Sequence, residues 1–499
     1  MGDQVRDKYI LTIDQSTSGS KVMLVDNNGD IMINKSKEHK QHYPEPGWVE
    51  HDPLEIYNNV INLIKDVLFD SNIKIDQLVS LAITNQRETV LLWDRDSGKP
   101  VYNAIVWQCS RTVDICNHLS NSVNNKMIKS KTGLLLDPYF SATKIKWIIE
   151  NIAEARESLE NNSLMAGTID SWLIWKLTKG QVHATDYTNA SRTLLFNIKT
   201  LFWDKELIQL FNLRNIILPE VKSSDEVFGY TSIDGLFPRR IPITGIIGDS
   251  QGALFGQKCF QPGMAKATYG TGTSVLLNIG EKPIFKENVI TSIAWGLNGK
   301  VDYAFEGIIR SSGDTLKWVK NNLGIFDDFK EVEPLINEIG DNEGVYLVPA
   351  FSGMGVPYWD MTAKAAIVGM TKKTDRRHII RAAVESIAYQ ITDAINLMID
   401  ESGVDLKSLK VDGGAVSNKF LMNFQAGLIN REVVVSQIAE LSALGAAYIS
   451  GLSVGIWQKT EDIKKLNNNP EIYQPGMKEP LRVKYYNGWH SAVKRTLNI

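Results

Sequence analysis

Two short turns, rich in glycine and in small hydroxyl residues, are the segments best suited to hold a polyphosphate. The first runs from Asp14 through Thr17 and Ser18 to Lys21, and the second covers residues 268–274. Small side chains let the backbone approach an anion, and hydroxyl groups can donate to phosphate oxygens. The carboxylate of Asp14 could hold Mg²⁺ through water. Each turn alone could equally be an ordinary polar hairpin, but a pair of them suggests a grip on both sides of a polyphosphate. Neither matches the P-loop pattern.

Charged residues at the ends of two apolar runs could act on a hydroxyl substrate. Asp249 follows the run 243–247, and a carboxylate at a strand end beside a cleft makes a good general base. Asp249 could also cap the next helix, and the two roles are compatible. Arg87 and Glu88 follow the run 78–83, where they could hydrogen-bond a polyol or form an ion pair on the surface.

A third turn joins a predicted strand to a predicted helix at residues 411–418 and contains Gly413 and Gly414. The glycines permit close approach of a flat ligand, and the following helix N-terminus favours negative charge. A simple tight turn is the alternative reading.

Hydrophobic patterning predicts a mixed α/β organisation in both halves of the chain. In the first half a helix is expected over residues 53–69, and strands are expected near residues 9–13, 22–25, 31–33 and 78–83. The second half repeats this order, with a long helix over residues 378–399 and strands near residues 264–269, 275–277 and 409–411. We therefore expect two related halves that join near residue 255, with a ligand cleft between them.

The composition of the 499-residue chain narrows the class of partner. Its formal net charge is −3, so no basic field points to nucleic acid or to anionic lipid. Runs of about 18 apolar residues, which would predict a membrane span, do not occur. The three cysteines, Cys109, Cys116 and Cys259, form no disulfide framework. Because the N-terminus also lacks a signal-like apolar core, a cytoplasmic location is expected.

Longer motifs resemble the FGGY family of carbohydrate kinases and, within it, the glycerol kinases. The resemblance runs from Tyr9 to about Trp457 and is carried by residues 46–53, 85–89, 103–109, 139–147, 186–193, 349–351 and 365–385. It implies an α/β fold of two ribonuclease H-like, actin-like ATPase domains with a cleft between them. We expect the N-terminal domain, residues 1–254, to carry the polyol pocket and the first phosphate hairpin. The C-terminal domain, residues 255–499, is expected to bind the nucleotide.

The same resemblance implies ATP-dependent phosphorylation of a small polyol, by default glycerol to glycerol 3-phosphate, with Mg²⁺ as the metal ion. Asp249 would accept the proton of the attacking hydroxyl, and Asp14 and Asp249 would hold the metal. Family positions that line the polyol pocket are matched by Arg87, Glu88, Trp107, Tyr139 and Asp249. Positions that contact the nucleotide are matched by Thr17, Ser18, Thr271, Gly313, Gly414 and Asn418, and Lys21 and Lys317 are further candidates for nucleotide binding. A homodimer or homotetramer is expected.

Several residues depart from the family pattern. Ser250 stands where glutamine is usual, and Ser274 stands where a phenylalanine usually packs on the glycerol carbons. Both changes would enlarge the acceptor pocket and make it more polar. Loss of the aromatic ring would also weaken binding of a three-carbon skeleton, because a buried aromatic ring contributes roughly a few kcal/mol. A larger polyol or ketose (a tetritol, a pentitol or a ketopentose) is therefore the alternative acceptor. Ser16 replaces a usual glycine and Lys317 a usual glutamine, and both changes bear on how the nucleotide is held.

A function of another class, a non-catalytic actin-like protein that binds ATP as a sensor, is the remaining alternative. The retained acidic and basic residues of the pocket argue against it, since a sensor does not need a general base.

Overall fold

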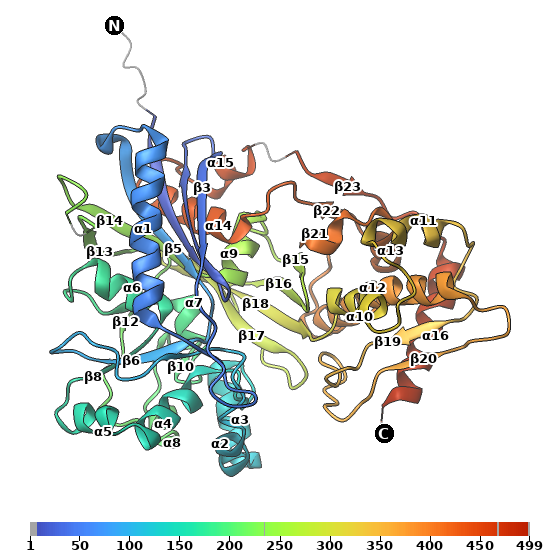
Figure 1. Cartoon of the computed structure of the whole chain (residues 1–499), viewed down its shortest axis with the longest axis horizontal. Coiled ribbons are helices and arrows are strands. Elements are labelled where there is room, and N and C mark those ends of the chain that lie inside the picture. Colours follow the sequence, from blue (N-terminus) through green and yellow to red (C-terminus); the bar gives the residue numbers. More distant parts are fainter. Residues whose placement is uncertain (1–6, 234, 467–468, 498–499) are drawn as a thin grey trace, which may run out of the picture.

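The computed structural model describes residues 7–233, 235–466 and 469–497, which form two α/β halves lying side by side (Figure 1). The N-terminal half is built on a six-stranded sheet in the order β13-β14-β5-β1-β2-β3. These strands are β1 (Tyr9–Gln15), β2 (Gly19–Val25), β3 (Ile31–Glu38), β5 (Leu78–Asn85), β13 (Val227–Thr231) and β14 (Ile241–Gly248). The strands β1, β2 and β3 are antiparallel neighbours, whereas β5 and β14 run parallel to β1.

The helix α1 (Pro53–Ser71) covers this sheet and illustrates how local sequence sets an element. The side chain of Asp52 caps its N-terminus by accepting from the N–H of Leu54, and Pro53 occupies the first turn, where a missing N–H costs nothing. Its apolar residues recur at helical spacing and are buried, so one face packs on β2 and β3. The helix ends at Asn72 in the left-handed conformation.

The C-terminal half contains a seven-stranded sheet in the order β17-β18-β16-β15-β21-β22-β23. Its strands are β15 (Met264–Tyr269), β16 (Thr273–Gly280), β17 (Ile290–Leu297), β18 (Lys300–Ile309), β21 (Ser408–Gly413), β22 (Val433–Val435) and β23 (Glu471–Tyr473). Pairing along β15, β16 and β18 is antiparallel, and β15, β21 and β22 are parallel. This repeats the pattern of the first sheet, so the two halves are related, as the patterning predicted, and share the ribonuclease H-like core that the resemblance implied.

Two helices, α9 (Asp249–Gly256) and α14 (Leu441–Ser453), pack against each other at the junction of the halves. Although α14 comes late in the chain, it packs on β1, β5 and β14 of the N-terminal sheet. The helices cross closely because Gly252 faces Gly445, where an added Cβ would collide with backbone. One apolar cluster draws on both sheets and both helices, so the halves share part of their core.

Smaller elements complete both halves. A four-stranded sheet contains β4 (Glu50–His51), β6 (Val90–Asp94), β7 (Ala104–Ile105) and β8 (Leu164–Thr168). Other N-terminal helices are α2 (Val113–Leu119), α3 (Ser122–Thr132), α4 (Ser141–Asn151), α5 (Ala153–Glu160), α6 (Ile169–Leu177), α7 (Tyr187–Ala190) and α8 (Lys205–Leu210). Other C-terminal helices are α10 (Gly313–Asn321), α11 (Val332–Asn337), α12 (Arg376–Ser402), α13 (Lys419–Ile429), α15 (Thr460–Lys464) and α16 (Glu479–Thr496). Two-stranded pairings join β9 (Ala184–Asp186) to β12 (Glu220–Lys222), β10 (Phe196–Asn197) to β11 (Phe202–Trp203) and β19 (Tyr346–Val348) to β20 (Ala366–Val368).

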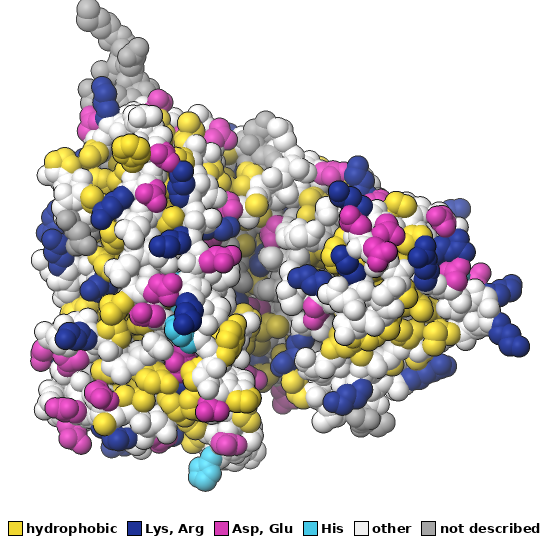
Figure 2. Space-filling model, viewed as in Figure 1, with side chains coloured by type: hydrophobic (Ala, Val, Ile, Leu, Met, Phe, Trp, Pro, Cys, Tyr) yellow, Lys and Arg dark blue, Asp and Glu magenta, His cyan; other side chains and the backbone are white. Residues whose placement is uncertain are grey.

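A groove separates the two halves on the face shown in Figure 2. Across the described ranges, no helix combines the length and the apolarity needed to cross a membrane. The three cysteines are buried and unpaired as thiols.

Candidate active site

The parallel strands β5 and β14 bring Arg87 and Asp249 together, because the carboxyl ends of parallel neighbours lie at the same edge of a sheet. The Nε atom of Arg87 lies 3.1 Å from Oδ1 of Asp249. The same oxygen accepts a 2.6 Å hydrogen bond from the N–H of Ser250, so two contacts orient the carboxylate. Asp249 is the first residue of α9, while Gly248 occupies the N-cap position. The prediction that Asp249 caps this helix was therefore wrong, since Asp249 already has helical geometry.

Arg87 also reaches across to the C-terminal half and enters a buried ion quartet, which we define as Arg87, Glu88, Arg192 and Glu306. Nη2 of Arg87 lies 2.9 Å from Oε1 of Glu306 on β18. Arg192 lies 2.5 Å from Glu88 and 2.5 Å from Glu306. All four side chains are buried. The surface ion pair considered for Arg87 and Glu88 is thus ruled out, because both side chains are enclosed between the halves.

Burial and the two guanidinium groups act in opposite directions on the carboxylates of the quartet. For Glu306, burial alone would raise the pKa, but Arg192 and Arg87 outweigh it and lower the pKa to about 2. For Glu88, burial prevails over the same two arginines and the pKa is raised. The backbone of Glu88 has φ of +62°, a left-handed conformation that side chains other than glycine rarely adopt and that often marks functional sites.

An aromatic wall adjoins this cluster and contacts the first hairpin. The rings of Trp107 and Tyr139 lie 5.3 Å apart between centroids. Burial raises the pKa of Tyr139, and the charge of Glu88 adds to the effect. Nε1 of Trp107 donates a 2.9 Å hydrogen bond to Oγ1 of Thr17. A predicted polyol-pocket residue and a predicted nucleotide-contacting residue therefore touch directly.

The first hairpin, residues 14–21, presents a buried carboxylate close to a second one. Burial raises the pKa of Asp14 to about 7, and nearby Asp249 and Glu440 raise it further against the lowering effect of Lys21. The negative charges of Asp249 and Glu440 thus oppose ionisation of Asp14, and a cation at this site would offset them. Lys21 itself pairs with Glu440 at 2.7 Å, at the start of α14. Ser18 at the tip is exposed.

A polar network of Gln41 and His51 stabilises the first hairpin. The Nε2 amide of Gln41 donates a 2.8 Å hydrogen bond to the carbonyl of Thr17. Oε1 of Gln41 lies 2.7 Å from Nε2 of His51, whose pKa is lowered to about 3 by burial first and by neighbouring histidines second. His51 is therefore neutral at physiological pH and acts as a fixed hydrogen-bonding partner. At the turn, Ser16 stands where glycine is usual. Its Oγ atom donates a 3.0 Å hydrogen bond to the carbonyl of Gly19, which holds the serine side chain in place.

The second hairpin, residues 268–274, packs on the start of α10. The carbonyl of Thr271 accepts from the N–H of Ser312 at 3.0 Å, and the carbonyl of Gly270 accepts from the N–H of Gly313 at 3.0 Å. A Cβ at Gly313 would lie 2.6 Å from the carbonyl oxygen of Gly270, so only glycine allows this approach. Thr271 is exposed at the tip, and Lys317 is exposed one turn along α10.

Ser274, on β16, pairs with Ile308 on β18 and shares its face of the sheet with Leu276 and Glu306, which pair one step along. It therefore faces the side on which Glu306 meets Arg87. Its Oγ atom is buried, and no described residue hydrogen-bonds to it. A buried hydroxyl without a partner is costly unless a ligand or water satisfies it.

The remaining predicted nucleotide residues follow β21. Gly414 is exposed at the turn after this strand. Asn418 caps α13, where its Oδ1 accepts from the N–H of Leu421 at 2.9 Å. The turn therefore presents exposed backbone beside a helix N-terminus, which suits an anionic ligand.

Sequence reasoning missed Arg192 and Glu306, although Glu306 carried a signal. Glu306 is a charge in the buried, apolar part of β18, residues 303–309, and a buried charge requires a partner. Lys266 on β15 is a second example, and it lies near the same site. Burial lowers its pKa, which is opposed first by the charge of Asp412.

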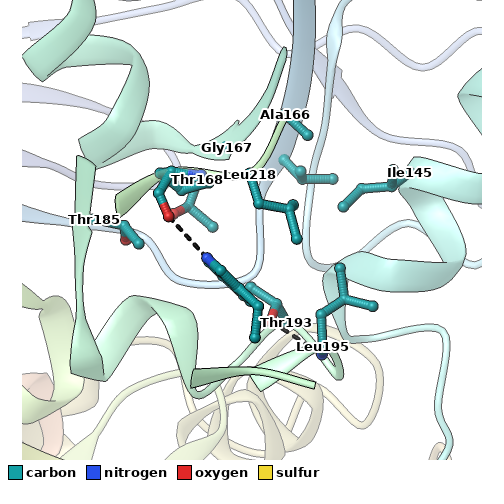
Figure 3. Close-up of a pocket in the computed structure, with 11 residues that line it drawn as sticks. Ile145, Ala166, Gly167, Thr168, Thr185, Thr193, Leu195 and Leu218 are labelled. Atoms are coloured by element: carbon teal, nitrogen blue, oxygen red, sulfur yellow. Dashed lines mark hydrogen bonds between the residues drawn. The ribbon is translucent and has the colours of Figure 1, made fainter. Parts of the chain in front are cut away.

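A small cavity lies apart from this site, in the N-terminal half (Figure 3). It has a volume of about 20 Å³, enough for roughly one water molecule. Trp203 is one of its lining residues, and its Nε1 donates to the carbonyl of Pro219 at 2.8 Å. It is a packing void and no substrate pocket. In the described part of the chain, no cluster of three or more His, Cys, Asp or Glu side chains could hold a metal ion.

The fold and the site together define a class of protein, an ATP-dependent kinase of the two-domain, actin-like ATPase architecture. Comparison with known proteins gives the family. Residues 9–256 match the N-terminal domain of the FGGY family of carbohydrate kinases, and residues 265–454 match its C-terminal domain. The chain belongs to this family.

Full-length relatives agree with this assignment. A protein named glycerol kinase from Caldanaerobacter subterraneus subsp. tengcongensis is 50% identical over 491 residues, which cover 98% of this chain and 99% of that protein. The crystal structure of Plasmodium falciparum glycerol kinase with ADP is 40% identical, with a TM-score of 0.93 over 99% of both chains. A ligand-bound xylulose kinase from Lactobacillus acidophilus has a TM-score of 0.87 at 20% identity, over 98% of this chain and 97% of that one, and supports the fold alone.

Proposed function

We propose that this protein phosphorylates glycerol to glycerol 3-phosphate with ATP, and that Asp249 is the general base. The observation that carries the proposal is the junction of the halves, where Asp249 meets Arg87 beside an aromatic wall. Full-length relatives named glycerol kinase support the choice of glycerol.

In the proposed reaction a polyol hydroxyl oxygen attacks the γ-phosphorus of ATP. The hydroxyl proton passes to the carboxylate of Asp249, the bond from the γ-phosphorus to the bridging oxygen breaks, and ADP leaves. The wall of Trp107 and Tyr139 packs on the carbon skeleton, while Arg87 and Glu88 hydrogen-bond the hydroxyl groups. The two hairpins, through Thr17, Ser18 and Thr271, would hold the phosphates, with Gly313 and Gly414 lining the nucleotide site. Lys21, Lys317 and Asn418 lie on the elements that flank it.

We assign Mg²⁺ to Asp14 and Asp249. Their mutual effect on the pKa of Asp14 fits a site that gains from a cation, and oxygen ligands are those that Mg²⁺ prefers. The bound ion would neutralise charge on the phosphates. Two carboxylates leave most positions around the ion open, so the remaining ligands would come from phosphate and water, as is usual for this ion.

A larger polyol or ketose remains a second candidate acceptor, and one specific observation favours it. The buried Oγ of Ser274 has no hydrogen-bond partner among the described residues. An additional hydroxyl on a four- or five-carbon acceptor could supply one. Ser250, beside Asp249, would widen the same pocket.

The test is ADP release from ATP and Mg²⁺ with glycerol, erythritol, threitol, xylitol and xylulose as acceptors. We expect the highest kcat/KM with glycerol, and a clear preference for a longer acceptor would overturn that choice while leaving the kinase intact. The variant Ser274→Phe should then move the preference toward glycerol. With Asp249→Asn, turnover should fall by roughly 10² or more while ATP binding persists. If the wild type binds ATP but phosphorylates none of these acceptors, the non-catalytic sensor becomes the better reading.

We further propose a cytoplasmic location and assembly as a homodimer or homotetramer. The buried thiols of all three cysteines suit a reducing compartment. Light scattering coupled to size-exclusion chromatography would give the mass of the assembly, and a mass near the 55.9 kDa of one chain would refute the oligomer.

A further inference from the structure

A second, larger cavity lies in the C-terminal half, at the C-terminal end of α9, whereas the candidate base is at the other end of this helix. Its volume is about 370 Å³, within the range of small-molecule sites. We call it the lysine cavity, because its described lining includes four lysines, together with a glutamine and a serine: Lys258, Lys410, Lys464, Lys465, Gln257 and Ser436. In Figure 1, α15 lies above α9, and β21 and β22 lie to the right of α9.

Backbone carbonyl groups fix two of these lysines in place. Nζ of Lys258 donates to the carbonyl of Leu466 at 2.7 Å, and Nζ of Lys410 donates to the carbonyl of Gln257 at 2.6 Å. An ammonium group carries three N–H donors, so each amine retains capacity for a further acceptor.

Carboxylates do not balance this charge inside the cavity, as no acidic residue is among its described lining. Lys464 and Lys465 have partners on their own helix, Glu461 and Asp462, at 3.6 Å each. Such exposed pairs are weak. Burial lowers the pKa of Lys258 to about 8, and the positive charge of Lys410 lowers it further. Lys258 and Lys410 therefore repel one another, and an anion between them would relieve that repulsion.

We propose that the lysine cavity binds a small phosphate-bearing anion as a site separate from the active site. Lysine binds phosphate as a compact point charge with several donors, and four lysines from three segments can surround one phosphate or a diphosphate. The cavity volume exceeds that of a single phosphate, so a pyrophosphate group or a small organic phosphate fits better.

The cavity is connected to both sides of the active site. Gln257, at the C-terminal end of α9, lies at the opposite end of that helix from Asp249. Its Nε2 donates a 3.0 Å hydrogen bond to Oδ2 of Asp412, which immediately precedes Gly413 and Gly414. Gln257 thus links an anion in the cavity to two parts of the active site. One is α9, which carries the proposed base, and the other is Asp412, at the start of the proposed nucleotide turn. Any kinetic effect of the anion rests on the proposed function, whereas its binding does not.

The test measures binding of pyrophosphate and of inorganic phosphate to the full-length chain by calorimetry. Saturating ADP and glycerol are present, so that the active site is filled and the remaining binding belongs elsewhere. The variant Lys258→Met/Lys410→Met keeps the apolar stems and removes two charges, and the matched control Lys372→Met/Lys373→Met removes two charges from an exposed loop. We expect the dissociation constant for pyrophosphate to rise roughly tenfold or more in the cavity variant and to stay unchanged in the control.

A second variant, Lys464→Ala/Lys465→Ala, alters only the outer lysines on α15, and it covers the case in which the first variant does not fold. It should weaken binding as well. Inorganic phosphate that binds as tightly as pyrophosphate would point to a single free phosphate as the ligand. Saturable binding that is equal in the wild type and in both cavity variants would overturn the proposal, as would absence of saturable binding by the wild type up to roughly 10 mM of either anion.

Discussion

Replacing Glu306 by glutamine should destabilise the protein by about 3 kcal/mol at pH 7, although the two side chains have nearly the same volume. In the folded state this carboxylate is the shared partner of two buried guanidinium groups, those of Arg87 and Arg192. Glutamine has nearly the same shape but no charge, so Arg192 would keep only Glu88 as its charged partner, and Arg87 would keep Asp249 and Glu88. Breaking a buried ion pair by removing one partner costs about 3–5 kcal/mol, because the other charge stays buried and uncompensated.

The lowered pKa of Glu306 gives a second route to the same magnitude. A fall from the ordinary 4.5 to about 2 corresponds to about 3 kcal/mol, at about 1.4 kcal/mol for each pH unit. Because the pKa is lower in the folded state, this stabilisation is complete above about pH 4.5 and is lost as the pH falls toward 2. At pH 7 it is fully present.

The free energy would be measured from the urea concentration at the midpoint of unfolding, followed by tryptophan fluorescence at pH 7. Glu281→Gln is the matched control, because Glu281 pairs with Lys300 at the surface and should change stability by less than about 0.5 kcal/mol. Adding Arg192→Met to Glu306→Gln removes the orphaned charge and should recover part of the loss. A Glu306→Gln protein within about 1 kcal/mol of the wild type would show that the quartet carries little of the stability.

Two further perturbations test the site. Trp107→Phe removes the hydrogen bond to Thr17 and should lower kcat/KM by roughly 2- to 12-fold, since a neutral hydrogen bond is worth about 0.5–1.5 kcal/mol. The control Trp203→Phe loses a similar hydrogen bond away from the site and should leave kcat/KM unchanged. Asp14→Asn should abolish most activity yet stabilise the free protein. Because the pKa of Asp14 is raised in the folded state, ionisation of Asp14 destabilises the wild type increasingly as the pH rises. The melting temperature of Asp14→Asn should therefore exceed that of the wild type by an amount that grows between pH 4 and pH 7 and then levels off.

Hydrophobic periodicity predicted the main strands of the two sheets and the helix on the first, because the spacing of apolar residues along the sequence shows which side chains an element buries. The helix expected over residues 53–69 is α1, and the hairpin expected near residue 20 joins β1 to β2. Periodicity could not place α14, which belongs by sequence to the C-terminal half but packs on β1, β5 and β14. Its position depends on close contact with α9 at Gly252, and contacts between distant segments leave no periodic trace.

The site was predictable to the extent that its residues follow strands. Asp249 and Arg87 end parallel neighbours, so strand order alone brings them to one edge. Arg192 and Glu306 come from a loop and from another sheet, and only the packing of the halves unites them with Arg87. The oddity of a charge in an apolar strand could have flagged Glu306, although it could not have named its partners.

The buried ion quartet also constrains how the protein can open for its substrates. Separating β18 from Arg87 and Arg192 would expose the quartet and forfeit about 3 kcal/mol, by the estimate made for Glu306. Movement confined to α10, which follows β18 in the chain, leaves these ion pairs intact. We therefore expect amide hydrogen exchange to be slow along β18 and faster at the start of α10, and to slow at α10 when ADP is added. Exchange that is equally fast in both segments would mean that the halves separate at the quartet itself.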